Sequence, residues 1–138
     1  MTTPNRIRWF GCVILVGALY GAIGIVFAWP ANQRFWRLAA WGVSGVIFVS
    51  QIGYEQLWLR NSRVPTAVHA ALAAALGGFL LAVGAMVHAA LTPIHAPYRR
   101  FLIALVAWPI ITGVPALLVA LVVTVVLGLT TNIIRHRS

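Results

Sequence analysis

The chain is almost without acidic side chains. Glu55 is its single carboxylate residue, and aspartate and lysine are both absent. Glycoside hydrolysis and related acid–base reactions use a pair of carboxylates, so one carboxylate excludes that chemistry. The patterns GxSxG, HExxH and GxxxxGK[ST] do not occur either. The sequence therefore predicts a protein that is not an enzyme.

Cysteine and clustered histidine are also scarce. The lone cysteine, Cys12, allows no internal disulfide, no CxxC pair and no thiolate metal site, and we expect it to be a small buried packing residue. His69 and His88 share one apolar segment but lie nineteen residues apart. That separation is about 28 Å along a helix, too far for one metal or one haem. His95 and His136 fall at the borders of apolar segments, so the sequence predicts no metal site and no cofactor.

Charged residues of any kind are rare. They make up only 8% of the 138 residues, whereas 62% are hydrophobic, and the mean hydropathy is +0.95. A soluble domain has about 25% charged residues, enough to cover a surface that faces water. We therefore expect lipid to surround most of this chain, and residues 1–138 to form a single transmembrane domain.

The ten arginines occur in pairs, and each pair borders an apolar segment. The pairs are Arg6 and Arg8, Arg34 and Arg37, Arg60 and Arg63, Arg99 and Arg100, and Arg135 and Arg137. In a soluble protein the net charge of +9 would favour nucleic-acid binding. Arginine at the borders of apolar segments instead suits anionic lipid headgroups, so the predicted partner is the bilayer and no nucleic acid.

Four apolar segments cover most of the sequence, at about residues 9–29, 38–59, 67–91 and 101–131. A helix of about 20 residues crosses the hydrocarbon core, and strands of a membrane barrel are only about 9–11 residues long. The linkers are short, so neighbouring helices should run antiparallel. The predicted fold is an all-α, integral membrane four-helix antiparallel bundle with both termini on the same side. Pro109 and Pro115 are expected kink points in the last helix.

The arginine distribution also predicts an orientation. In an antiparallel arrangement six arginines lie on the side of the termini and four on the other side. Because positive residues accumulate in the cytoplasm, this count favours cytoplasmic termini, and we expect a bacterial inner membrane.

Small residues form stripes on two of the predicted helices. Gly17, Gly21 and Gly24 lie on one face of the first helix. The third helix carries a longer stripe, which consists of Ala71, Ala74, Ala75, Gly78, Ala82, Ala85 and Ala89. Such stripes let helix backbones approach closely in lipid. They predict helix packing, either with another helix of this chain or with a second copy.

Glu55 belongs to a polar face of the second predicted helix. Ser44, Gln51 and Glu55 stand at spacings of i, i+7 and i+11, which place them on one side. That face should turn away from lipid. In one interpretation Glu55 pairs with Arg60 or Arg63 and fixes the helices structurally. In the other, Glu55 is a proton or cation site that works with Gln51 and Ser44.

Two functions follow from these features. The first is a small structural or accessory membrane subunit that associates with itself or docks to a larger membrane complex, as the small-residue stripes and short loops indicate. The alternative is a small proton- or cation-coupled transporter or channel that uses Glu55.

Overall fold

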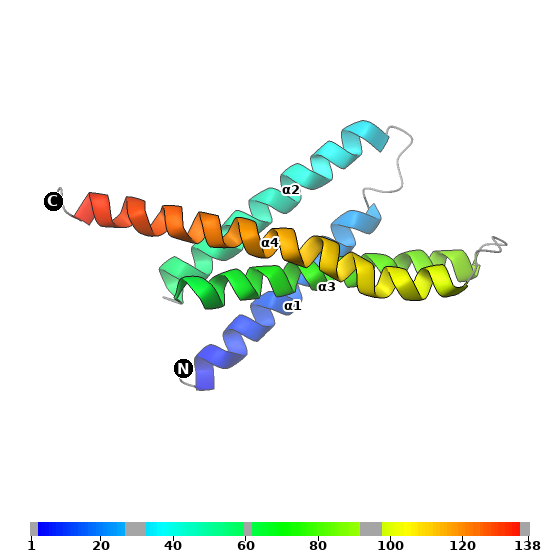
Figure 1. The fold of residues 1–138 in the computed structure, drawn as a ribbon, viewed down its shortest axis with the longest axis horizontal. Coiled ribbons are helices and arrows are strands. Elements are labelled where there is room, and N and C mark those ends of the chain that lie inside the picture. The colour runs from blue at the N-terminus through cyan, green and yellow to red at the C-terminus, as the bar shows by residue number, and fades with distance from the viewer. Residues whose placement is uncertain (1–2, 27–32, 60–61, 92–97, 136–138) are drawn as a thin grey trace.

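The computed structural model describes residues 3–26, 33–59, 62–91 and 98–135 (Figure 1). These residues form α1 (Thr3–Val26), α2 (Gln33–Gly53), α3 (Arg63–Leu91) and α4 (Tyr98–Arg135). A short π-helix, η1 (Tyr54–Trp58), continues α2. Within these ranges all residues except Leu59 and Ser62 are helical and none forms a strand, which confirms the all-α, four-helix prediction.

All four helices are long and apolar enough to cross a membrane. The qualifying stretches are Arg8–Val26, Arg34–Trp58, Arg63–Leu91 and Arg99–Leu129. Each stretch begins at an arginine, as expected if arginine marks the border of the apolar part.

The helices extend beyond the apolar segments from which they were predicted. α2 begins at Gln33 rather than near residue 38, and α4 covers Tyr98–Arg135 rather than residues 101–131. Hydropathy marks where the chain is apolar, whereas a helix continues through polar residues until its backbone is interrupted. α3 begins at Arg63 rather than at residue 67, with Pro65 in its first turn. Proline is tolerated there because the first N–H groups of a helix have no intrahelical acceptor.

α4 is one continuous helix through Pro109 and Pro115. Between the two prolines, the Thr112 hydroxyl lies 2.9 Å from the carbonyl oxygen of Trp108 in the same helix.

α3 is the central helix, with α1 packed along one side and α4 along another (Figure 1). α3 and α4 are antiparallel, because Arg63 lies against Gly128 near one end and Gly78 lies against Trp108 further along. α1 runs parallel to α3, since Gly17 meets Leu76 and Gly21 meets Leu80. This zigzag brings both termini to the same side of the molecule, as predicted (Figure 1).

The small-residue stripe of α3 faces α4. A Cβ added to Gly78 would lie 2.9 Å from the carbonyl oxygen of Trp108, so the two backbones are almost in contact. Gly113 of α4 is similarly close to Ala75. The Thr112 hydroxyl also lies 3.1 Å from the carbonyl oxygen of Ala74, across the interface. Close backbones and a hydrogen bond between helices are the usual means of helix association in lipid.

The glycine stripe of α1 receives leucine side chains from α3. Gly17, Gly21 and Gly24 face Leu76, Leu80 and Leu81, respectively. Both small-residue stripes therefore have partners within this chain. Toward α1, α3 presents leucines that fill the spaces at the α1 glycines, and also Gly77, which receives the side chain of Tyr20 from α1.

α2 joins the other helices only near its C-terminal end. There Ile52 packs with Ala67 and Ala70 of α3 and Ala120 of α4, and all four are buried. The N-terminal half of α2 diverges from the other helices (Figure 1). Trp41 in that half is 80% exposed.

Candidate functional site: a buried carboxylate–imidazole pair

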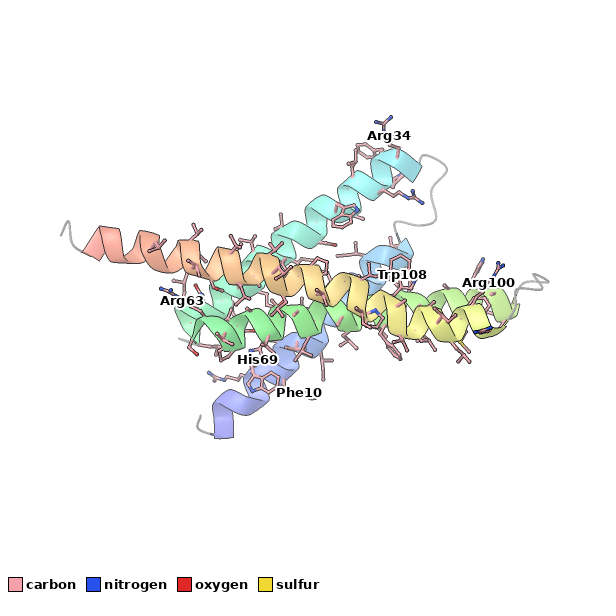
Figure 2. All side chains as sticks on the ribbon, viewed as in Figure 1. Phe10, Arg34, Arg63, His69, Arg100 and Trp108 are labelled. Carbon is pink, nitrogen blue, oxygen red and sulfur yellow. The ribbon has the colours of Figure 1, made fainter. Side chains whose placement is uncertain are left out.

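Glu55 and His69 form a hydrogen-bonded pair inside the helix assembly. His69 Nδ1 lies 2.7 Å from Glu55 Oε2, and the Glu55 residue is 0% exposed. Figure 2 shows His69 on α3 close to Phe10, where α1 meets α3. One of the two atoms, His69 Nδ1 or Glu55 Oε2, donates a hydrogen bond to the other, and the tautomer of the imidazole decides which atom is the donor.

The turn between α2 and α3 brings the two residues to the same depth. Glu55 precedes Ser62 by seven residues and His69 follows it by seven. In an antiparallel helix pair, residues at equal distances from the turn lie side by side.

The π-helix η1 adjusts the direction of the Glu55 side chain. Its characteristic hydrogen bond runs from the Leu59 N–H to the carbonyl oxygen of Tyr54, at 3.2 Å. In an α-helix, every fourth residue drifts by about 40° around the axis. The wider π turn reduces that drift, so Gln51, Glu55 and Leu59 all remain buried on one face.

Trp9 of α1 covers the imidazole of His69. The two rings are parallel to within 1°, with their centroids 4.3 Å apart. Stacked aromatic rings contribute about 0.5–1.5 kcal/mol beyond the area that they bury. Three elements therefore hold the pair: η1 supplies the carboxylate, α3 supplies the imidazole and α1 supplies the ring above it.

Further buried polar groups lie one turn from the pair on each side. Gln51 is 3% exposed, and neither its amide nitrogen nor its amide oxygen has a hydrogen-bond partner among the described residues. Thr66, one turn before His69 on α3, is 0% exposed, and its hydroxyl likewise has no partner in the described part of the chain. A buried polar group without a partner costs about 1–3 kcal/mol. Their presence on both sides of the pair marks this region as a polar centre.

The structure brings together two of the three residues predicted for this site. Gln51 and Glu55 are buried on one face, whereas Ser44 is only half-buried and lies two turns before Gln51. Arg63, a predicted ion-pair partner of Glu55, has its guanidinium against Gly128 of α4. The other predicted partner, Arg60, lies outside the described residues.

His69 is the residue that sequence reasoning missed. It was considered only as a ligand for a metal or haem shared with other histidines, and not as a partner of the carboxylate. The signal was present in the sequence, because Glu55 and His69 are equally far from the centre of the turn between their helices.

A groove of about 500 Å³ opens beside the pair, between α1 and η1. It is lined by Arg8, Gly11, Cys12, Leu15, Tyr54 and Trp58. Glu55 is not part of its wall, but the neighbouring residue Tyr54 is. The groove therefore ends close to the polar centre, with the positive charge of Arg8 at its edge.

Within the described ranges, no three histidine, cysteine or acidic residues lie close enough together to hold a metal ion. Comparison of the chain with models of protein families, with curated proteins and with solved structures gives no match. Conclusions about function therefore rest on the geometry of the chain itself.

Proposed function

We propose that the chain is an integral membrane protein of a bacterial inner membrane, with both termini in the cytoplasm. The support comes from four helices of spanning length and from the arginine pairs at their borders. Fusions of a cytoplasmic and a periplasmic reporter at the linkers would test the orientation. Activity of the periplasmic reporter at the C-terminus would contradict it.

Within that membrane, we propose a non-enzymatic role as an accessory subunit that associates with itself or with a larger complex. The observation that carries this proposal is the unpacked half of α2. An added Cβ at Gly42 or Gly45 meets no atom of the described residues within 4 Å, so neither glycine packs closely against another helix in that part of the chain. Exposed glycine lowers helix stability by about 0.5–1 kcal/mol relative to alanine, and it is useful where another backbone comes close.

Cysteine cross-linking in native membranes tests this role. In a Cys12→Ala background, Gly45→Cys should form a disulfide-linked dimer or a cross-link to a partner subunit. Val119→Cys is the matched control, because Val119 is an exposed residue of α4 that lies on no small-residue stripe. Equal cross-linking at both positions, or none at Gly45→Cys, would contradict a specific interface on α2.

A bulky substitution provides an independent test. Gly45→Leu should abolish the association and leave the melting temperature of the monomer unchanged, because no described residue of the chain opposes the new side chain. Native mass spectrometry from gentle detergent measures the stoichiometry and also identifies any partner that copurifies.

The second candidate function is a small proton- or cation-coupled transporter or channel, and the Glu55–His69 pair favours it. Ionisable residues inside a membrane are rare, and they usually mark a pathway for protons, ions or substrates. Histidine is also a partner that can accept and release a proton, whereas arginine stays charged. In proteoliposomes, ion flux through the wild type should collapse in Glu55→Gln. A wild type that carries no ion would remove this candidate.

A further inference from the structure

The buried polar groups lie at successive turns between α1, α2 and α3. Going from Glu55 back along α2 to Gln51 and Ile47, each step is one turn. Going forward along α3 from His69 to Ala73 and Gly77, each step is also one turn. Because the two helices are antiparallel, Gln51 lies at the level of Ala73, one turn beyond the pair.

α1 packs along the same levels. Trp9 stacks on His69, Val13 and Val16 pack on Ala73, and the Tyr20 side chain lies against Gly77. The buried hydroxyl of Tyr20 has no hydrogen-bond partner among the described residues. It occupies the level after Gln51, where Ile47 of α2 packs against the same cluster.

The polar seam therefore consists of Thr66, the Glu55–His69 pair, Gln51 and Tyr20, in this order. From Thr66 to Gly77 it follows eleven residues of α3, which is about 16 Å of helix. This is roughly half the thickness of a hydrocarbon core of about 30 Å. The seam begins at Thr66 in the first turn of α3, on the side of the termini, and the groove lined by Tyr54 lies beside the level of Glu55.

Unpaired buried polar groups at successive levels are the environment in which internal water is held. A buried water typically makes about three hydrogen bonds to protein groups that would otherwise have no partner. The Gln51 amide, the Thr66 hydroxyl and the Tyr20 hydroxyl each offer such a group. Water at these levels would connect the Glu55–His69 pair to the groove and to Tyr20.

The chemistry of the seam favours protons over metal cations. Hard cations such as Ca²⁺ take about six to eight oxygen ligands around one point. Here the described oxygen donors are spread over successive turns, and Glu55 Oε2 is already held by an imidazole nitrogen. A proton needs only one acceptor and a hydrogen-bonded path.

We infer that this seam is a water-filled half-channel that carries protons from the termini side through the Glu55–His69 pair to the level of Tyr20. The inference rests on the second candidate function and names its substrate. In the central step the Nδ1–H bond of His69 breaks as an O–H bond forms at Glu55 Oε2, and the charged pair becomes a neutral one. Release of that proton to a water on the Gln51 side leaves a carboxylate and a neutral imidazole, and a second proton, taken up by His69 Nδ1 from the Thr66 side, restores the charged pair.

Proteoliposomes that hold the full-length protein and a pH-sensitive dye give the first test. A potassium gradient with valinomycin drives the proton flux, and sodium and potassium tracers are measured in separate liposomes without valinomycin. We expect proton flux in the wild type, flux at the level of protein-free liposomes in Glu55→Gln, and a marked loss in Gln51→Leu. Gln56→Leu is the matched control, because this half-buried glutamine is in the same π-helix but outside the seam. It should retain the flux.

Two results separate the inference from the function on which it rests. Flux of sodium or potassium that depends on Glu55, without proton flux, would keep the transport function and overturn the proton seam. Proton flux that survives in both Gln51→Leu and Thr66→Val would overturn the seam as the path. These two variants replace a polar side chain by an apolar one of similar size, so they should still fold.

Nuclear magnetic resonance of the histidine-labelled protein in lipid gives a readout without flux. The His69 ring, assigned by its loss in His69→Gln, should exchange magnetisation with water in the wild type and lose this exchange in Gln51→Leu. A ring without water contact in the wild type would overturn the half-channel, whatever the flux.

Discussion

Replacing Gly78 by alanine tests the close approach of α3 and α4. The new Cβ would lie 2.5 Å from Thr112 Oγ1 and 2.9 Å from the carbonyl oxygen of Trp108. The hydroxyl can rotate away, but the carbonyl belongs to the backbone of α4, so the helices must separate. Overpacking of this kind costs about 1–3 kcal/mol. Loss of the hydrogen bond from Thr112 to Ala74 adds about 0.5–1.5 kcal/mol to the destabilisation. The higher helix propensity of alanine offsets up to about 1 kcal/mol of it. The net expected destabilisation is about 0.5–4.5 kcal/mol.

Gly45→Ala is the matched control, because it makes the same chemical change where the structure leaves open space. In the monomer it should be neutral or stabilise by up to about 1 kcal/mol. Unfolding of both variants in mixed micelles, followed by circular dichroism, measures the difference, and Gly78→Leu should lose the folded state or the assembly. If Gly78→Ala is as stable as the wild type, or if Gly45→Ala loses as much, the α3–α4 packing described above is wrong.

Three further substitutions test the Glu55–His69 pair, the Thr112 hydrogen bond and the ring stacked on His69. His69→Ala removes the imidazole from a fully buried carboxylate, and we expect it to lower the free energy of unfolding in micelles by about 3–5 kcal/mol. The double variant His69→Ala with Glu55→Leu should recover part of this loss of stability. A double variant as unstable as the single one would contradict the pairing. Thr112→Val removes the donor to the Ala74 carbonyl, and we expect a loss of about 0.5–1.5 kcal/mol in the same assay; an unchanged midpoint would mean that the bond adds nothing. Trp9→Leu keeps an apolar contact but removes the stacked ring, and we expect it to lower the stability of the fold by about 0.5–1.5 kcal/mol. A double-mutant cycle with His69 should show that this loss occurs only while His69 is present.

The helices could be predicted from sequence because hydropathy and length are properties of single segments. A run of about 20 apolar residues has few alternatives to a spanning helix. The number of helices, their order and their antiparallel direction therefore follow from the sequence. The helix ends were predicted less well. Gln33 and Tyr98 are polar or amphipathic residues that extend α2 and α4 past the apolar part, and hydropathy does not register them.

The partners of individual residues depend on register and rotation, which composition does not contain. The stripe around Gly78 indicated a packing face, but the identity of its partner required the position of α4. For Glu55, proximity along the sequence predicts Arg60 and Arg63 as ion-pair partners. The structure gives it His69, which is further along the chain but closer in space because of the helical turn between them. The π turn at Tyr54–Trp58 could not be predicted, since nothing in those five residues distinguishes it from an α-helix.

The central position of α3 has a consequence for biosynthesis. If the helices span a membrane, as proposed, α1 and α2 would enter the bilayer first during translation. These two helices share few contacts, and the glycine face of α1 packs against leucines of α3, which is synthesised after both. A ribosome-stalled chain that ends after α2 would hold two inserted helices without a fixed mutual arrangement. Emergence of α3 would then organise the earlier helices, so this third segment acts as the template on which the rest of the molecule is assembled.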